Sequence, residues 1–117
     1  MKLLVAGSRE ITDRCLVFGI VDDILAVYKL NPTLIISGGA RGIDSLAESY
    51  AEAKGIPKQI FNAEWDVYGK RAGFLRNEQM GKEADALIAI WDSKSRGTKN
   101  MIEIMQSLSK KVYIVRV

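Results

Sequence analysis

The most constraining feature of this sequence is the stretch LIISGGARGID, residues 34–44. It begins as an uncharged apolar run, which predicts a strand buried on both faces, and it passes through three glycines into a predicted helix. Without Cβ atoms, Gly38, Gly39 and Gly42 can adopt positive φ and expose backbone N–H groups to a ligand. The following helix adds the positive end of its dipole, so the stretch predicts a phosphate or carboxylate site. A tight turn that uses glycine for geometry alone is the plain alternative.

Predicted strands and helices alternate along the rest of the chain. Strands are expected at residues 2–6, 33–37, 56–61, 86–91 and 112–115, with helices between them at about 12–30, 44–54, 73–84 and 98–108. Residues 62–72 are expected to be irregular. Because parallel strands are joined by right-handed crossovers, we expect one α/β domain, residues 1–117. Its fold would be a Rossmann-like three-layer arrangement with a parallel five-stranded sheet of order 3-2-1-4-5. Ligands would then bind between the first and fourth strands, where the winding direction reverses.

Local signals mark the expected helix ends. Thr12 or Asp13 is a suitable N-cap for the first helix. Ser45 and Glu48 have the spacing of a capping box at the start of the second helix, and Gly55 is a suitable stop.

Composition and missing motifs exclude several functional classes. The chain has no histidine and one cysteine, Cys15, which excludes a serine–histidine hydrolase, a histidine-ligated metal and a cysteine-rich zinc site. The turn at 38–42 is not GxGxxG, and no GK[ST] phosphate loop is present, so ATP hydrolysis is not expected. We expect no metal and no cofactor. No apolar run approaches the roughly 18 residues of a membrane span and no signal-peptide pattern precedes the first strand, so we expect a cytoplasmic protein without membrane contact.

Basic residues gather in the segments that follow strands or start helices. The net charge is only +3, yet many of the 17 lysines and arginines belong to this set: Arg9, Arg14, Arg41, Lys70, Arg71, Arg76, Lys94, Arg96 and Lys99. On a parallel sheet those segments share one edge, and a positive rim there suits a phosphorylated small molecule or a nucleic-acid backbone. The ordinary solvation of loops explains part of the pattern. Near the expected switch point lie hydroxyl and guanidinium groups that bind phosphate and ribose oxygens: Ser8, Arg9, Ser37, Arg41, Ser95, Arg96 and Thr98.

Motifs spread over essentially the whole chain resemble the YspA-like branch of the SLOG superfamily. They are GSR at 7–9, SGGARGID at 37–44, Trp65, YGK at 68–70, AG at 72–73, RN at 76–77, Met80, AD at 84–85, WD at 91–92, SRGT at 95–98 and MI at 101–102. The second motif is also similar to that of the DNA-processing protein DprA, and the later half resembles the Lonely Guy phosphoribohydrolases. The resemblance implies a Rossmann-like domain that binds a nucleotide or a nucleotide-derived signal such as an ADP-ribose compound.

The resemblance to the Lonely Guy enzymes also places candidate catalytic residues. Arg76 falls on the arginine that they use at the glycosidic bond, whereas their catalytic glutamate falls on Met101. Glu103 would face away, because two residues turn a helix by about 200°. If the protein is an enzyme, the expected catalytic residues are Arg76, Asp44 and Asp92, although each aspartate is equally explained as a helix cap or loop acceptor.

The resemblance and the residue chemistry together give an expected ligand-binding set. It comprises Gly7, Ser8, Arg9, Ser37, Gly38, Gly39, Arg41, Gly42, Asp44, Tyr68, Lys70, Arg76, Asn77, Asp92, Ser95, Arg96, Gly97 and Thr98. Within it, replacing Arg96 is expected to weaken phosphate binding. Three functions stay open: binding or sensing of a nucleotide-derived ligand, N-glycoside hydrolysis of a nucleoside monophosphate, and DprA-like binding of single-stranded DNA. The small net charge and the few aromatic residues weaken the third.

A homodimer is expected as well, because the Lonely Guy enzymes are oligomers and the last helix has apolar residues beyond one stripe. Met101, Met105 and Leu108 follow helical spacing toward the sheet, whereas Ile102 and Ile104 lie off it. Such residues need a second partner, supplied by another chain or by the end of the first helix. Replacing Ile102 with glutamate is expected to dissociate the dimer.

Overall fold

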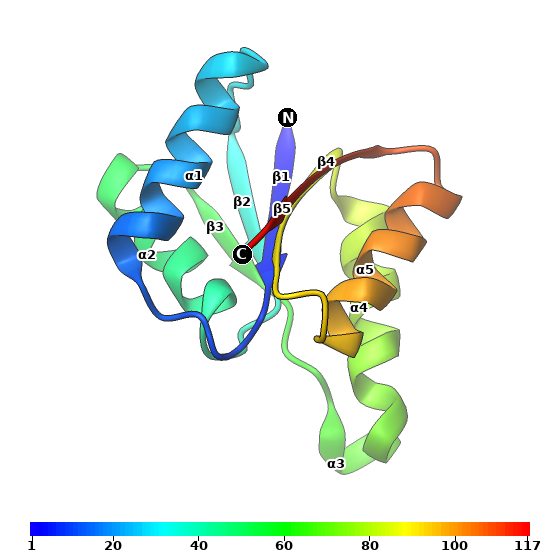
Figure 1. Ribbon diagram of the computed structural model, residues 1–117. Coiled ribbons are helices and arrows are strands. Elements are labelled where there is room, and N and C mark those ends of the chain that lie inside the picture. The colour runs from blue at the N-terminus through cyan, green and yellow to red at the C-terminus, as the bar shows by residue number, and fades with distance from the viewer.

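The computed structural model describes residues 1–117 and shows a parallel five-stranded sheet with helices on both faces (Figure 1). The strands are β1 (Lys2–Gly7), β2 (Leu34–Ser37), β3 (Lys58–Ile60), β4 (Ala86–Trp91) and β5 (Lys111–Arg116). The helices are α1 (Arg14–Val27), α2 (Ile43–Lys54), α3 (Trp65–Tyr68), α4 (Ala72–Glu83) and α5 (Arg96–Ser107), with a 3-10 turn at Gly69–Arg71. The strand order is β3-β2-β1-β4-β5, which confirms the predicted Rossmann-like topology.

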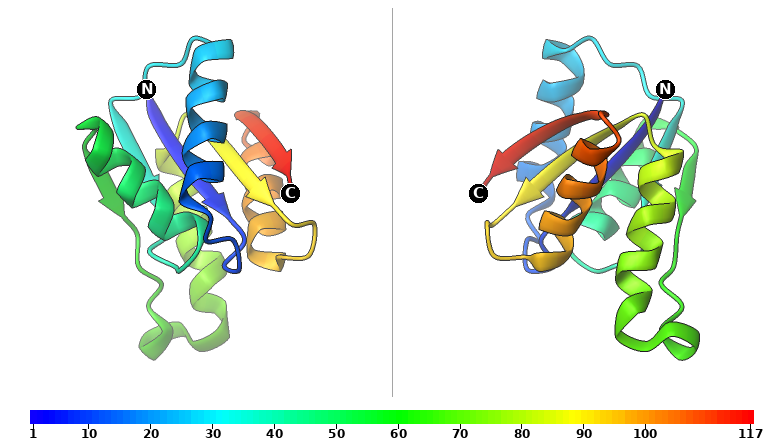
Figure 2. Two further views of the ribbon diagram at one scale, coloured as in Figure 1. Left: turned by 60° about the vertical axis from the view of Figure 1, so that its left-hand side comes forward. Right: turned by 90° about the vertical axis from the view of Figure 1, so that its right-hand side faces the viewer.

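Two apolar cores lie on opposite faces of the sheet. Helices α1 and α2 cover one face, and α4 and α5 cover the other (Figure 2). Along β1, Leu3 and Val5 pack on the α1–α2 side, whereas Leu4 and Ala6 pack on the α4–α5 side. These alternating positions are all buried, which explains why the strand sequence is continuously apolar.

The helix ends follow local chemistry that the sequence reveals only in part. Asp13 is the N-cap of α1, and its carboxylate accepts a hydrogen bond from the backbone N–H of Leu16 at 3.1 Å. The helix ends at Val27, earlier than expected. None of the helices is both long enough and apolar enough to cross a membrane.

The capping box predicted at Ser45 and Glu48 is wrong. Helix α2 begins earlier, with Gly42 as its N-cap and no side-chain cap. The Glu48 carboxylate instead accepts a hydrogen bond from the Ser37 hydroxyl at 2.7 Å. Because Glu48 bonds to the end of β2, it is not available to cap its own helix.

The segment expected to be irregular contains α3 and the 3-10 turn. Together they project beyond the carboxyl ends of the strands before the chain enters α4 (Figure 1). Helix α5 also begins earlier than expected, at Arg96, because the Ser95 hydroxyl caps it by accepting from the N–H of Thr98.

The prediction that Ile102 lies on a dimer surface is wrong. Ile102 is 6% exposed and belongs to the α4–α5 core with Met80, whereas Leu108 is 42% exposed beyond the end of α5. Helix α5 packs against α4 as well as the sheet, so its buried face is wider than a single stripe. Glutamate at Ile102 would bury a charge and unfold the chain. The homodimer itself stays a prediction, but Ile102 cannot form its interface.

Candidate functional site

The carboxyl ends of β1 and β4 are tied together at the point where the sheet reverses its winding. The Ser8 N–H donates to the carbonyl of Ile90 at 3.2 Å, and the N–H of Asp92 donates to the Ser8 hydroxyl at 3.0 Å. The Ser8 carbonyl accepts from the N–H of Ile43, which fixes the start of α2 against the same point. Ser8 is therefore used within the fold, and its side chain is only 1% exposed.

The glycine turn between β2 and α2 is held by its own backbone. Gly42 has φ 75°, and a Cβ there would lie 2.5 Å from the carbonyl oxygen of Arg9. Only glycine therefore permits this close approach of the two loops. The N–H of Gly39 donates to the Ser37 hydroxyl at 3.2 Å, so Ser37 shapes the turn from inside the protein.

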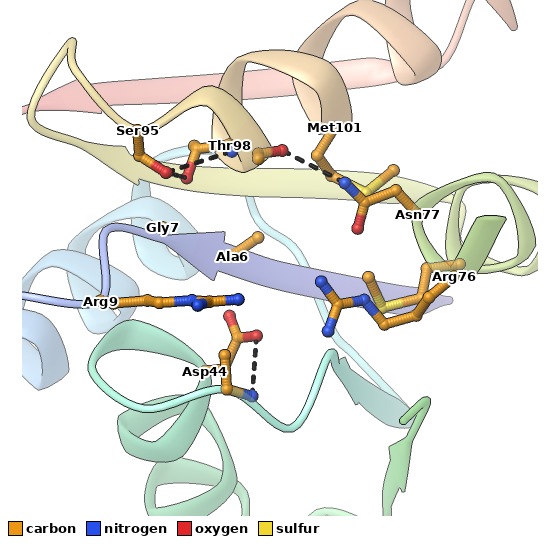
Figure 3. Close-up of a pocket in the computed structure, with 12 residues that line it drawn as sticks. Ala6, Gly7, Arg9, Asp44, Arg76, Asn77, Ser95, Thr98 and Met101 are labelled. Atoms are coloured by element: carbon orange, nitrogen blue, oxygen red, sulfur yellow. Dashed lines mark hydrogen bonds between the residues drawn. The ribbon is translucent and has the colours of Figure 1, made fainter. Parts of the chain in front are cut away.

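Two arginines face each other across a cavity beyond these loops. Arg9 follows β1 and Arg76 lies on α4, and their guanidinium groups point toward one another with the Asp44 carboxylate between them (Figure 3). Arg76 donates from Nη1 to the carbonyl of Gly38 at 2.8 Å, but its buried Nε has no hydrogen-bond partner. Burial lowers the pKa of the Arg76 guanidinium.

Asp44 occupies an unfavourable position for a carboxylate. It lies in the first turn of α2 and is 7% exposed. Burial raises the pKa of Asp44 to about 6, although the N–H of Ala40 and the charges of Arg76 and Arg9 oppose this rise. The N–H of Ala40 donates to Asp44 Oδ2 at 3.3 Å. Asp44 is thus a buried carboxyl whose protonated form is more favourable than that of a carboxyl in water.

The start of α5 forms the opposite wall of the cavity. Asn77 donates from its amide to the carbonyl of Gly97 at 3.2 Å and to Asn100 Oδ1 at 2.9 Å, which joins α4 to α5. The hydroxyls of Ser95 and Thr98 lie 3.0 Å apart. These contacts place hydroxyl and amide groups around the space between the two arginines.

Asp92 belongs to the loop rather than to the cavity. Its Oδ1 accepts from the N–H groups of Lys94 at 2.8 Å and Ser95 at 2.9 Å, and these bonds lower the pKa of its carboxyl. The expectation of a loop acceptor describes Asp92 better than that of a catalytic carboxylate.

Three hollows share Arg9 and Arg76 and together form the cleft. The inner cavity has about 50 Å³ of free space and an apolar floor that includes Met80 and Met101. The outer cavity has about 430 Å³ and lies over the glycine turn. A side cavity of about 130 Å³ runs toward α3. The position where the Lonely Guy enzymes have a glutamate is thus a buried methionine, and Asp44 is the only carboxylate lining these cavities.

A sequence model of the YspA, cpYpsA-related SLOG family matches residues 1–68, more than half of the 117-residue chain. The protein belongs to this SLOG family. Gene 61 protein of Mycobacterium phage D29 is 33% identical over an alignment of 113 residues, and the match covers 90% of this chain and 88% of that protein. Membership confirms the family that the motifs indicated.

The fold of this SLOG-family chain is shared with the DNA processing protein A (DprA) of Streptococcus pneumoniae. The X-ray structure of that protein matches 99% of this chain with a TM-score of 0.78 and 18% sequence identity. At this identity the likeness shows the fold alone. The SLOG-family chain spans 50% of the length of that DprA chain.

Most of the residues predicted for the SLOG-family site come together in the cleft. Those that line its cavities are Gly7, Arg9, Gly38, Gly39, Arg41, Asp44, Lys70, Arg76, Asn77, Ser95, Gly97 and Thr98. Ser8, Ser37, Gly42 and Asp92 support the surrounding loops instead. Tyr68 lines two further hollows with Leu75 and Gln79, one of which also includes Asn62 and Arg76, and Arg96 is exposed outside all of the cavities.

Sequence reasoning missed several lining residues. Asn62 and Trp65 line the outer cavity, and Met80 and Met101 form the floor of the inner one. Asn62 lies just beyond the end of β3, so the rule that ligands bind beyond strand ends was a usable signal. The two methionines belong to the motifs of the family resemblance, and Met101 falls on the catalytic glutamate of the Lonely Guy enzymes, but they were not assigned to the site because a buried thioether has the sequence pattern of any core residue.

Proposed function

We propose that this protein binds a phosphorylated, nucleotide-derived ligand in the cleft at the carboxyl ends of the strands. The phosphate would occupy the inner cavity between Arg9 and Arg76. Water needs about 10–15 Å³ of such space per molecule, so a cavity of about 50 Å³ suits one compact tetrahedral group. Belonging to a SLOG family and sharing the fold of DprA support nucleotide or nucleic-acid binding in general.

The observation that carries this proposal is the unpartnered Nε of Arg76. A buried donor without an acceptor costs about 1–3 kcal/mol, and a phosphate oxygen would remove that cost. Planar guanidinium groups also match phosphate oxygens with two parallel hydrogen bonds. Arg9 faces the same space, and no hydrogen bond joins it to the other lining residues (Figure 3). Two guanidinium groups therefore line the inner cavity with Asp44 between them, and the raised pKa of Asp44 reduces the negative charge that a phosphate would meet there.

A second candidate function, N-glycoside hydrolysis of a nucleoside monophosphate, is favoured by Asp44. Cleavage of such a bond uses a carboxylate that stabilises positive charge on the sugar or activates water. Asp44 lies beside Arg76 and has a pKa of about 6, which suits proton exchange near neutral pH. Met101 leaves no second carboxylate in the inner cavity, so we rank binding above hydrolysis.

The binding proposal is tested by thermal unfolding with AMP, ADP-ribose, adenosine and adenine. Only the two phosphorylated compounds should raise the melting temperature, by an amount equivalent to about 2.7 kcal/mol at a hundred times the dissociation constant. Equal shifts with adenine and AMP would contradict the proposal. An oligonucleotide that competes with AMP only at low salt would indicate a DNA backbone on the basic rim instead.

Hydrolysis is tested by following base release from AMP with the wild-type protein and with Asp44→Asn. Release that is lost in the variant would establish Asp44 as the catalytic carboxylate. No release over many hours at saturating AMP would leave binding as the function.

A further inference from the structure

Trp65 stands at the mouth of the cleft on a segment that projects from the domain. It is the first residue of α3 and is 50% exposed. It lines the outer cavity with Arg9 and Arg41, and it lines the side cavity with Lys70. The indole therefore forms a wall shared by two cavities, and both cavities also contain Arg76.

The indole ring of Trp65 packs against the start of α4, but no aromatic ring or cation of the protein stacks on it. Its Cη2 lies 3.2 Å from where a Cβ on Gly73 would stand, so the ring edge rests on the start of α4. The two aromatic pairs of the protein, Phe18–Tyr50 and Tyr28–Tyr113, lie elsewhere. No cation lies over the ring either, since the cation–aromatic contacts involve other rings.

Trp91 shows what a structural tryptophan looks like in this protein. Its Nε1 donates to the carbonyl of Ser95 at 3.0 Å, and the guanidinium of Arg116 lies 5.9 Å from its ring centroid. Both its polar edge and one face are thus occupied by the chain itself. Trp65 has neither contact, so its open face is available to a planar group.

Resting on the proposed phosphate site, we infer that the outer cavity binds a nucleobase stacked on the Trp65 indole while the phosphate lies at Arg76. The ligand class is then a nucleoside phosphate, and a sugar phosphate or an inorganic anion would fill only part of the site. Trp65 is the residue that determines this preference.

The sizes of the two cavities support this division. The inner cavity of about 50 Å³ is too small for a nucleoside, whereas the outer cavity of about 430 Å³ lies in the range of small-molecule sites. Stacking on an aromatic ring suits any base, because every base has a π face. Asn62 lies over Gly39 in the same cavity and supplies amide donors and acceptors for a base edge.

Calorimetric titration with AMP, ribose 5-phosphate and inorganic phosphate tests the inference. The wild-type protein should bind AMP at least about tenfold more tightly than ribose 5-phosphate, the effect of one stacked base. Trp65→Ala should remove most of that difference, so it should weaken AMP binding far more than ribose 5-phosphate binding, whereas Trp65→Phe should keep most of the difference. Val67→Ala is the matched control, because Val67 is a 69% exposed residue of α3 that lines no cavity of the cleft.

Three results overturn the inference, and one of them also removes its basis. Equal wild-type affinities for AMP and ribose 5-phosphate would show that the base is not bound. A loss in Trp65→Ala that is the same for both ligands, or no loss at all, would show that the ring does not stack on the base. If no phosphorylated compound binds, the proposed function fails together with the inference. Quenching of tryptophan fluorescence by AMP but not by ribose 5-phosphate, absent in Trp65→Ala, supports it.

Discussion

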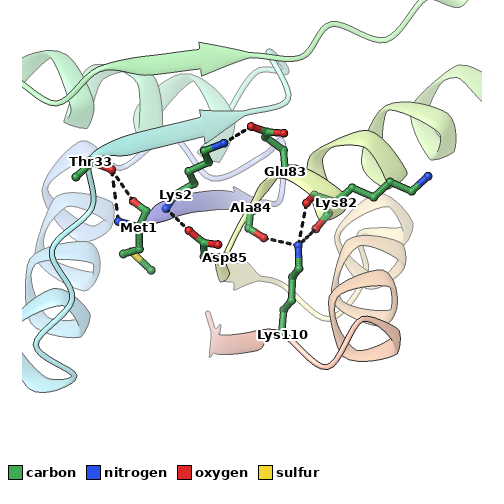
Figure 4. A network of polar contacts seen from close by, with 9 residues as sticks. Met1, Lys2, Thr33, Lys82, Glu83, Ala84, Asp85 and Lys110 are labelled. Atoms are coloured by element: carbon green, nitrogen blue, oxygen red, sulfur yellow. Dashed lines mark hydrogen bonds and ion pairs between the residues drawn. The ribbon is translucent and has the colours of Figure 1, made fainter.

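The two ends of the sheet differ in how completely their charged groups are satisfied. At the amino end, Lys110 donates from Nζ to three carbonyls at the end of α4: Gly81 at 2.7 Å, Lys82 at 3.0 Å and Ala84 at 2.6 Å (Figure 4). These carbonyls would otherwise lack partners, and a lysine there also complements the helix dipole.

Other charged groups at the amino end are paired in the same way. Lys2 forms an ion pair with Glu83, and its backbone N–H donates to the Asp85 carboxylate at 2.7 Å (Figure 4). At the carboxyl end, Arg41 forms an exposed ion pair with Glu10 at 2.7 Å, but Arg76 has a buried Nε without a partner, and burial disfavours the charged form of Asp44.

This difference agrees with the proposal that the amino end of the sheet serves stability and the carboxyl end receives a ligand. Unsatisfied buried groups persist in a fold when another function requires them. Four substitutions test this comparison between the two ends of the sheet.

Removing the Arg76 guanidinium should have the largest effect, and the effect should be on binding. Arg76→Ala is expected to weaken AMP binding by about 2–5 kcal/mol, because it removes a partly buried charge that would pair with phosphate. Titration calorimetry measures the loss, and circular dichroism checks that the variant is folded. Arg71→Ala is the matched control, since Arg71 lies outside the cleft and should leave the affinity unchanged. If Arg71→Ala lost as much AMP affinity as Arg76→Ala, the cause would be the change in net charge.

Asp44→Asn should raise stability in a pH-dependent way. The folded pKa of Asp44 is about 6 and its ordinary value is 3.8, so folding favours the protonated form. The protonated Asp44 therefore contributes its full share to the unfolding free energy below pH 3.8, and this contribution is lost as pH rises through about 6. Relative to wild type, Asp44→Asn should gain up to about 3 kcal/mol in unfolding free energy at pH 8 and almost nothing at pH 4. Denaturant unfolding at both pH values measures this, and a variant that is less stable at pH 8 would contradict it.

Lys110→Met should affect stability without affecting binding. The variant keeps the aliphatic stem but loses the ammonium group that serves three carbonyls, so the unfolding free energy should fall by about 2 kcal/mol. The affinity for AMP should not change. Lys111→Met, at an exposed neighbouring position, is the control and should be close to neutral. A binding defect in Lys110→Met would mean that the two ends are coupled.

Arg96→Ala should have the smallest effect. The sequence favoured Arg96 as a phosphate ligand, but the structure places it on the exposed first turn of α5, outside the cavities. An exposed charge at this position should change the AMP affinity by less than about threefold. If Arg96→Ala lost as much AMP affinity as Arg76→Ala, Arg96 would contact the ligand. The start of α5 would then have to move when AMP binds.

The fold was predictable because its signals are local and repeated. Strand order followed from the alternation of apolar runs with helices and from the handedness of crossovers. The wrong predictions concern side chains that contact residues far away in the sequence. Glu48 bonds to Ser37 across the end of β2, and Ile102 is covered by α4, and no spacing along one helix reveals either contact.

The sequence predicted the positively charged residues of the candidate site better than it predicted the shape of the cavity. Arg9, Arg76 and the glycine turn were predicted from their places near strand ends and helix starts, and the family resemblance also selected Arg76. The space between them depends on which loops the backbone brings together. Ser8 and Ser37 looked like ligands in the sequence, yet both hydroxyls are used inside the fold. The stacking role proposed for Trp65 rests on its missing partners, whereas the sequence marked this residue only as a motif of the family resemblance.

A crystal structure of the protein with bound AMP would show whether the phosphate lies at Arg76. The account predicts phosphate oxygens about 3 Å from the Arg76 guanidinium, including its Nε, with Arg9 on the other side and Asp44 adjacent. It would be contradicted by AMP bound elsewhere at full occupancy, for example in the hollow lined by Tyr68 and Arg71, with Arg76 Nε still lacking a partner.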